Sequence, residues 1–522
     1  MAKSNKITVY YIKDGLDNDS ILEKGVSRLE LNDGILYYNP KRIINPDWVD
    51  GFFNSNNNLR KIFKVASCQA LFIKSVIIDK NERKFAISFG SGRFLLNEPV
   101  FVPNFGLKVV LNMIDEKNIK KIDTHNISSM PKHKSEQVAK VGGIREFSIN
   151  YETDILMGIT GGIDKDKNLS TIFGSNITGR DSLSANVKFD CKNIDIFLKE
   201  IYKYYNSDEY KKNGFAWIDN INRILPKDDL FEKLNGKLNG ELKDIKNKTD
   251  KIWIDVPEII KWEDIKGFYY KDKNDLKDDL NLLDLDGELS IEKLKHLNVH
   301  TLGCNKDEVI HKWSALKCLY AEIEFNDNIY IFINLCWYKV DSNFKKIIND
   351  NFNKILKKQS PIIDWPNFDG KNEKEYNINL SKKIKGSMCL DANNIHYGGG
   401  HSQIEFCDVF DIDCKNIIHV KKYAGSSVLS HLFNQGYASA ELLKNDKEFK
   451  LKAAEKIQKQ NPNFLFDDSA DYNIIFVILN SKEPEKANNL PFFSKITLNH
   501  IVSTINNMKG YNSFVKIIST NI

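Results

Sequence analysis

The sequence predicts an α+β protein with an N-terminal α+β domain, a charged connecting module and a C-terminal α/β domain on a mixed sheet. Its 522 residues exceed what one compact domain usually holds. Apolar residues make up 42% of the chain, enough for sizeable cores. Runs that alternate like strands are interspersed with runs of helical spacing. We place the three parts at residues 1–225, 226–380 and 381–522.

The N-terminal part reads mainly as strands. Strand-like runs are predicted at 6–13, 29–38, 63–79 (entered through a helix), 84–96 (broken by a glycine-rich turn and continuing as a helix or strand) and 105–115. Residues 145–164 resemble a strand or loop before a short helix. Residues 194–213 have strong helical spacing. Together these elements indicate one α+β domain.

The connecting module is rich in charged residues of both signs. Residues 226–295 carry many Lys, Asp, Asn and Glu residues around a strand-like segment, 251–262. Mixed charge with interspersed apolar residues favours a surface-rich module over a disordered tail. Residues 317–341 predict two strands with a turn at Asn326, and 342–358 predict a helix.

The C-terminal part predicts the order β-β-β-α-β-α-β. A hydroxyl at Ser426 or Ser427 is well placed to cap the long helix that follows the third strand. The next strand is a continuous apolar run, as in a buried central strand. The last helix should end at Gly510. In chain order the elements are strands 387–397, 402–413 and 416–423, a helix from 426 or 427, strand 472–480, helix 495–510 and strand 513–519.

Composition restricts the cellular setting. The net charge of +5 permits nucleic-acid binding without demanding it. The start of the chain lacks the apolar core of a signal peptide, and no apolar run approaches membrane length. None of the eight cysteines forms a C-x-x-C pair. We therefore expect a cytoplasmic protein with reduced thiols and no membrane segment.

Arginine is confined to the first 223 residues, where eight occur. Its planar fork suits phosphate better than lysine does, so a phosphate contact is expected in this half. Arg93 follows a glycine-rich turn, and Arg180 follows Thr178 and Gly179. With Arg145 and the lysines of 132–134 they could line a nucleic-acid groove. The alternative is that these turns are ordinary, and neither a Walker A loop nor a G-x-G-x-x-G motif is present.

The stretch 417–443, "IIHVKKYAGSSVLSHLFNQGYASAELL", is the richest in chemistry. An apolar strand ends at Lys421, and a helical pattern follows. Polar residues Ser427, His431 and Gln435 recur every fourth position, and Ser439 continues the stripe. A solvated helix face in this chain would carry Lys, Glu or Asp, so the uncharged stripe favours a lined cleft over a solvated face.

The order of residues 387–480 resembles the core of the PD-(D/E)XK nuclease superfamily. That core puts carboxylates and a lysine on neighbouring strands and follows them with a helix that often carries a polar contact. The resemblance implies carboxylates that hold Mg²⁺ or Mn²⁺, and a lysine that acts with the metal on water and phosphate. The catalytic candidates are Asp391, Glu405, His419, Lys421 and Gln435. The metal-ligand candidates are Asp391, Glu405 and Asp408, and the nucleic-acid contacts are Arg93, Arg145, Arg180, Ser427 and His431.

The match departs from the superfamily pattern at one position. A carboxylate usually stands two residues before the lysine, where this chain has His419. Strand alternation puts His419 and Lys421 on one face. If 402–413 is one continuous strand, the same alternation puts Glu405 and Asp408 on opposite faces. We therefore expect that these two cannot bind the same metal. His419 remains open to three roles: ligand, general base or buried structural residue.

Several stretches together resemble a family of bacterial proteins of about this length, described by its sporadic distribution. They include "FGSGRFLL", "FGLKVVLNMID", "TGRDSL", "FAWIDNI", "IEFCDVF" and "LPFFSKITLNH". The resemblance implies an intracellular protein of mobile-element or anti-phage defence loci, and it carries no established catalytic residues.

Three hypotheses follow. The first is a nucleic-acid-binding anti-phage defence protein with a metal-dependent nuclease-like C-terminal domain. The second is a non-catalytic module that binds DNA or RNA. The third is an enzyme that acts on a nucleotide held by Arg93 and Arg180. The expected partners are nucleic acid and, in addition, a second copy of the chain or another defence protein.

Overall fold

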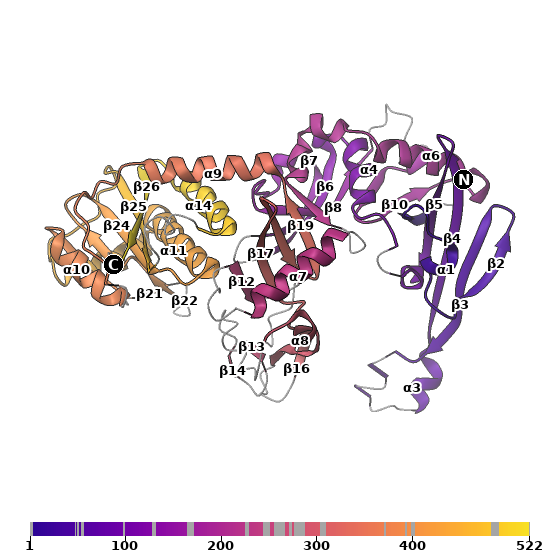
Figure 1. Cartoon of the computed structure of the whole chain (residues 1–522), viewed down its shortest axis with the longest axis horizontal. Coiled ribbons are helices and arrows are strands. Elements are labelled where there is room, and N and C mark those ends of the chain that lie inside the picture. The colour runs from indigo at the N-terminus through magenta and orange to yellow at the C-terminus, as the bar shows by residue number, and fades with distance from the viewer. Residues whose placement is uncertain are drawn as a thin grey trace. The chain divides into compact units, whose positions relative to one another are not determined.

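The chain forms two compact units, each described by itself (Figure 1). The first comprises the described residues up to Asp219, except 126–132, and the second comprises 126–132 and the described residues from Asn220 onward. Helices and several sheets form the structure, with a mixed sheet near the C-terminus, as the α+β prediction requires. The computed structural model describes residues 4–46, 48–49, 52–53, 57–97, 100–127, 132–163, 172–224, 229–243, 251–254, 267–270, 274–275, 288–302, 309–369, 372–391, 394–397, 402–481 and 490–520.

The first unit is built on one large sheet. Helices α4 (Phe105–Met113) and α6 (Ile194–Tyr205) pack with it around a core rich in Phe, Ile, Leu and Val. Two short helices, α1 (Asn18–Ile21) and α3 (Asn57–Ile62), lie in its connections. In pairing order the described strands are β2 (Ser27–Leu31), β3 (Gly34–Ile44), β4 (Val65–Ile78), β5 (Asn81–Gly90), β1 (Asn5–Tyr11), β10 (Leu183–Val187), β9 (Asn176–Gly179), β8 (Asp154–Gly162), β6 (Ile119–Asn126) and β7 (Lys132–Gly142).

The strand predicted at 105–115 is wrong, because these residues form helix α4. Nearly every residue of α4 is buried, and Lys108 and Asn112 are its only polar residues, so the 3.6-residue period that distinguishes a helix is only weakly marked. Gly106 lets the helix approach the sheet, since a Cβ atom there would lie 1.9 Å from the Ser182 carbonyl oxygen.

Three other predictions in this unit need correction. Residues 29–38 contain parts of two strands, β2 and β3, joined by a turn. Residues 65–78 are all strand, and the helix expected at 63 ends at Ile62. In 145–164 a short helix comes before strand β8 rather than after it.

The second unit begins with two antiparallel sheets and their helices. The prediction of two strands over 317–341 missed one, because a second tight turn at Asn334 and Leu335, both with positive φ, separates β18 from β19. The helix predicted at 342–358 is confirmed. The described elements are β11 (Ile221–Ile224), β19 (Cys336–Val340), β18 (Asn328–Ile333), β17 (Leu319–Phe325) and β12 (Ile252–Ile254) in one sheet; β14 (Asn274–Asp275), β13 (Gly267–Tyr270), β15 (Asn298–Leu302) and β16 (Val309–Ser314) in the other; and helices α7 (Asp229–Lys243), α8 (Ile291–His296) and α9 (Ser342–Lys357).

The mixed sheet near the C-terminus carries the predicted order β-β-β-α-β-α-β. Its first three strands are antiparallel neighbours, and its last three are parallel. Helix α12 is an addition that the sequence did not predict, and the predicted strand residues of β21 and β22 form a separate hairpin. The elements are β20 (Ser387–Cys389), β23 (Val409–Asp411), β24 (Asn416–Lys422), β25 (Tyr472–Asn480) and β26 (Tyr511–Ser519) in the sheet, β21 (Asn394–Tyr397) with β22 (Ser402–Glu405), and helices α10 (Glu373–Lys383), α11 (Ser426–Asn445), α12 (Lys447–Gln458) and α14 (Phe492–Asn506).

Helices cover both faces of this sheet. Ile418 and Val420 of β24 share a core with α10, whereas Ile417 shares one with α11, α12 and α14. Because side chains alternate along a strand, β24 is buried on both faces, which explains its unbroken apolar run.

Four boundaries in this region were predicted wrongly. Segments 387–397 and 402–413 each divide between the mixed sheet and the hairpin. Helix α11 has Gly425 at its N-cap, with no side-chain capping bond. Helix α14 ends at Asn506, four residues before Gly510.

Among the described residues, we find no helix with the length and apolar character needed to cross a lipid bilayer.

A buried carboxylate links the middle of the second unit to its C-terminal helices. Helix α14 begins at Phe492, and its N-cap residue, Pro491, offers no side-chain cap. The Glu322 carboxylate of β17 accepts hydrogen bonds from the backbone N–H groups of Phe492 and Phe493, at 2.9 and 3.2 Å. Glu322 is 1% exposed, and burial raises its pKa, against the effects of Lys251 and the two N–H groups. The contact therefore caps α14 from a distant strand.

We predict that Glu322→Ala lowers the free energy of unfolding by about 2–3 kcal/mol, because two buried N–H groups lose their charged acceptor. Denaturant titration of the full chain measures this change. Glu324→Ala is the matched control, since Glu324 lies on the same strand, bonds Lys251 and is more than half exposed. The control should change stability by less than about 1 kcal/mol. Equal losses in the two variants would contradict the capping role.

Candidate metal centre

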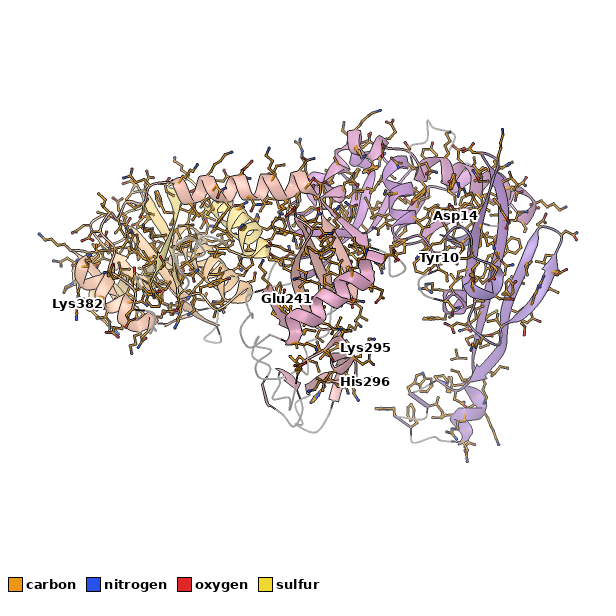
Figure 2. All side chains as sticks on the ribbon, viewed as in Figure 1. Tyr10, Asp14, Glu241, Lys295, His296 and Lys382 are labelled. Carbon is orange, nitrogen blue, oxygen red and sulfur yellow. The ribbon has the colours of Figure 1, made fainter. Side chains whose placement is uncertain are left out.

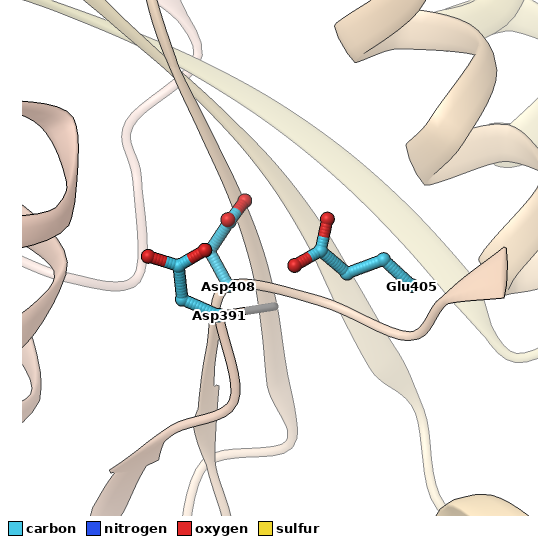
Figure 3. Close-up of side chains that lie close together, drawn as sticks. All are labelled: Asp391, Glu405 and Asp408. Atoms are coloured by element: carbon cyan, nitrogen blue, oxygen red, sulfur yellow. The ribbon is translucent and has the colours of Figure 1, made fainter. Parts of the chain in front are cut away.

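Three carboxylates converge at the edge of the mixed sheet. Asp391, Glu405 and Asp408 each offer an oxygen, and these atoms all lie within 4.8 Å of one another. Figure 3 shows the three side chains pointing toward a common space. Oxygen ligands at this spacing match what Mg²⁺ or Mn²⁺ requires.

The expectation that Glu405 and Asp408 face apart is wrong, since their carboxylate oxygens lie within 4.8 Å of each other. It assumed one continuous strand over 402–413, but β22 ends at Glu405 and β23 begins at Val409. Between them the chain leaves the hairpin and enters the mixed sheet, so strand alternation does not apply. Asp391 lies where the chain passes from the mixed sheet into the hairpin, two residues after β20 ends.

Backbone contacts fix Asp408 in place. Its N–H donates to the Ile418 carbonyl at 3.0 Å, and its own carbonyl accepts from Leu390 N–H at 2.8 Å. Its carboxylate Oδ2 accepts from the Val420 N–H at 2.7 Å. The side chain thus takes the place of a strand partner where the β23–β24 ladder ends.

The environment of Asp408 disfavours a negative charge. Burial and, to a smaller extent, the nearby carboxylates of Glu405, Asp391 and Glu373 raise its pKa to about 8, against the lowering effect of the Val420 N–H. Without a cation, the cluster therefore holds a proton at neutral pH. A divalent cation would remove the repulsion that favours this proton.

Asn377 of α10 lies between two of the carboxylates. It is fully buried, and its Nδ2 is 3.4 Å from Asp391 Oδ2 and 3.5 Å from Asp408 Oδ1. Its amide can donate one proton toward each acid. The helix thus contributes a neutral donor to an acidic site.

The polar stripe of α11 reaches the centre through its second half. Gln435 Nε2 donates to Glu405 Oε2 at 2.8 Å, and Ser439 Oγ donates to the Glu405 carbonyl at 3.3 Å. His431 is exposed, and the side chain of Ser427 lies outside the described residues. The structure therefore brings Gln435 to the cluster.

Lys421 lies beside the cluster and pairs with a carboxylate that sequence analysis missed. Its Nζ is 2.9 Å from Glu373 Oε1, and the backbone N–H of Lys422 donates to Glu373 Oε2 at 2.7 Å. Burial opposes the charged form of Lys421. The bond to Glu373 and the negative charges of Glu373, Asp408 and Glu405 outweigh burial and raise its pKa.

His419 is buried away from the converging carboxylates. Its ring is fully buried near Phe476 and Gly436, and neither ring nitrogen has a hydrogen-bond partner among the described residues. Burial lowers its pKa to about 3, so the ring is neutral at pH 7. The ring nitrogens are not among the converging ligand atoms. The geometry therefore favours the structural role among the three left open.

The three arginines predicted to contact nucleic acid have different surroundings in the first unit. Arg93 lies over the rings of Tyr10, labelled in Figure 2, and Phe101, and donates to the Leu96 carbonyl. Arg180 is exposed and pairs with Asp123, and Arg145 is exposed in a short helical turn. Arg93 thus packs on two rings, and phosphate contact by Arg93, Arg145 and Arg180 stays a prediction.

Glu373 and Asn377 are the site residues that sequence analysis missed. They are four positions apart on α10, so they lie on the same face of the helix as they approach the centre. Two signals were available: Asn372 caps the helix at its start, and Tyr376 and Leu380 have helical spacing. Assigning this segment to the connecting module concealed both.

Comparisons with known proteins give one match. A family model described as "Family of unknown function (DUF6119)" matches residues 7–519. Neither the search of curated proteins nor the search of solved structures finds a match.

We predict that His419→Leu flattens the pH dependence of stability. In the parent, the pKa of His419 is about 3 when folded and near 6.5 when unfolded. The unfolded state therefore binds the proton first, and this contribution to stability is lost as pH falls from 6.5 toward 3. Below pH 6 the free energy of unfolding of the parent should fall by up to about 1.4 kcal/mol per pH unit more than that of the variant.

Urea titrations of the full chain between pH 7 and about pH 4 would measure this difference. His431→Leu is the control: that ring is exposed, so the variant should keep the pH dependence of the parent. Parallel profiles for His419→Leu and the parent would mean that the ring takes up a proton in the folded protein.

Proposed function

Since the chain belongs to a family of unknown function, matched over residues 7–519, we propose its activity from its own geometry. The proposed activity is metal-dependent hydrolysis of phosphodiester bonds in nucleic acid, carried out by the C-terminal part of the second unit. The convergence of Asp391, Glu405 and Asp408 within 4.8 Å is the observation that carries it.

The donor set fits a hard divalent cation. All three groups are carboxylates, and their mutual repulsion contributes to the raised pKa of Asp408. The cation, Mg²⁺ or Mn²⁺, would be held by Asp391, Glu405 and Asp408. Its positive charge would stabilise the negative charge on the scissile phosphate, and it would lower the pKa of a bound water.

The side chains around the carboxylates suit the same chemistry. Lys421 places a cation beside the acids, within reach of a phosphate that displaces Glu373. Gln435 orients Glu405 through its amide, and Asn377 orients Asp391 and Asp408. A positive charge that meets phosphate in the transition state contributes through electrostatic stabilisation.

The arrangement supports the resemblance to the PD-(D/E)XK core in one respect and departs from it in another. Asp391, Asp408 and Lys421 come from the ends of neighbouring strands, and α11 follows with a polar contact, as that core requires. His419 stands where the superfamily has a carboxylate. The third carboxylate, Glu405, comes from the hairpin β21–β22 and not from a strand of the mixed sheet.

The biological setting belongs to the same proposal. The resemblance to proteins of mobile-element and anti-phage loci favours a defence nuclease that acts on foreign nucleic acid in the cytoplasm. A non-catalytic nucleic-acid-binding module and a nucleotide-cleaving enzyme are the alternatives that the following experiment separates.

We predict that the purified protein cleaves plasmid, linear DNA or RNA with Mg²⁺ or Mn²⁺ and not with EDTA. Lys421→Ala should lower the cleavage rate by at least about a hundredfold, because the charge beside the phosphate is lost. Glu405→Gln should lose activity together with the thermal stabilisation that the metal gives the parent, since an amide is a poor ligand for Mg²⁺.

Asp413→Asn is the matched control. This exposed carboxylate lies in the turn between β23 and β24, outside the cluster, so both activity and metal stabilisation should persist. Binding without cleavage under every metal condition would replace the proposal with the non-catalytic module. Cleavage of nucleotides but not of polymers would favour the third hypothesis.

A further inference from the structure

An extended arm leaves the sheet of the first unit. Strand β2 pairs with β3 only as far as Tyr38, and β5 pairs with β4 only from Gln69 onward. Beyond these points β3 and β4 continue as a two-stranded ribbon to Ile44 and Val65. Figure 1 shows α3 at its far end. We call the described residues of 43–65 the arm tip.

The arm tip exposes an unusual amount of apolar surface. Eight of its apolar side chains are between 41% and 80% exposed, and Phe52 is the most exposed of them, whereas Val49 is buried. Contiguous exposure of this kind marks an interaction surface in a folded protein. The side chains are Ile43, Ile44, Trp48, Phe52, Phe53, Ile62, Phe63 and Val65.

The exposed rings are held in a defined arrangement. The Trp48 ring contacts Phe53 and Phe63 at centroid distances of 5.9 and 4.9 Å, and Phe52 contacts Phe53 at 5.0 Å, all edge to face. Asn45 Nδ2 donates to the carbonyls of Arg60 and Phe63, which ties the end of β3 to α3. The tip therefore presents preorganised aromatic surfaces, which limits the entropy lost on binding.

Positive charge accompanies the rings. Residues 43–65 of the sequence contain three basic residues and two acidic ones. Lys61 and Lys64 are exposed and flank Ile62 and Phe63, and Asn57 presents an exposed amide nearby. Cations interleaved with rings complement a polymer that carries both phosphates and stackable bases.

We propose that the arm tip binds single-stranded nucleic acid, with bases stacked on Phe52, Phe53 and Trp48 and phosphates near Lys61 and Lys64. The choice of partner rests on the proposed function of the C-terminal centre. The exposed amide favours bases over lipid, because bases offer hydrogen-bond partners and a hydrocarbon layer offers none. The exposed ammonium groups of Lys61 and Lys64 favour a polyanion over a neutral protein surface.

The test is fluorescence anisotropy of a labelled oligothymidylate titrated with the full chain in EDTA, so that binding is measured without cleavage. Phe52→Ala/Phe53→Ala should weaken binding by at least about tenfold, because base stacking is lost. Lys61→Ala/Lys64→Ala should lower the slope of log affinity against log salt by about 1.4, since two phosphate contacts are removed.

Matched controls come from the second unit. Ile363→Ala/Leu465→Ala removes two apolar side chains that are 88% and 74% exposed. Lys295→Ala/Lys346→Ala removes two exposed lysines; Lys295 is labelled in Figure 2. Both should bind the oligonucleotide like the parent.

The proposal is overturned if the tip variants bind the oligonucleotide as the controls do. It is also overturned if these variants lose binding to phosphatidylserine vesicles but not to the oligonucleotide, or if light scattering shows that only their oligomeric state has changed. Because the assay excludes metal, its outcome is separate from that of the cleavage experiment. An inactive centre with a functional tip would defeat the proposed function alone. An active nuclease whose tip variants bind normally would defeat this inference alone.

Discussion

The candidate centre depends on how Asp408 is held. Its N–H and carboxylate bond the Ile418 carbonyl and the Val420 N–H of β24, while its carbonyl accepts from Leu390, next to β20. One residue thus joins the ends of three elements. Burial at this junction raises its pKa to about 8. The same contacts that position the acid therefore make its negative charge costly unless a cation is present.

Polar groups on both faces of the sheet offset the negative charge of the carboxylate cluster. On one side, α10 provides the Asn377 amide and the Glu373 carboxylate that holds Lys421. On the other, α11 provides Gln435, which bonds Glu405. Neutral donors and one ion pair thus surround a group of like charges. Such a network gives the centre a defined geometry before any ligand arrives.

The amphipathic helix and the long apolar strand were predictable, whereas a short buried run was ambiguous between helix and strand. The amphipathic helix at 342–357 and the apolar strand at 472–480 agree with the sequence prediction. The run 105–113 was predicted as a strand but is a helix; it is buried almost throughout, and its two polar residues, Lys108 and Asn112, mark the helical period only weakly. The segment 402–413 has neither Gly nor Pro where β22 gives way to β23, and the single Asp408 there did not mark its division.

The sequence by itself determined which groups were available: carboxylates at 391, 405 and 408, a lysine closing an apolar strand, and uncharged polar residues at helical spacing. Only the tertiary structure decided which of them meet. Glu405 reaches Asp408 because the chain changes sheets between them. Glu373 reaches Lys421 across 48 residues because α10 packs against β24. Hydrogen bonds and ion pairs act over a few ångströms, so their partners follow from how the elements pack, and local periodicity carries no record of that packing.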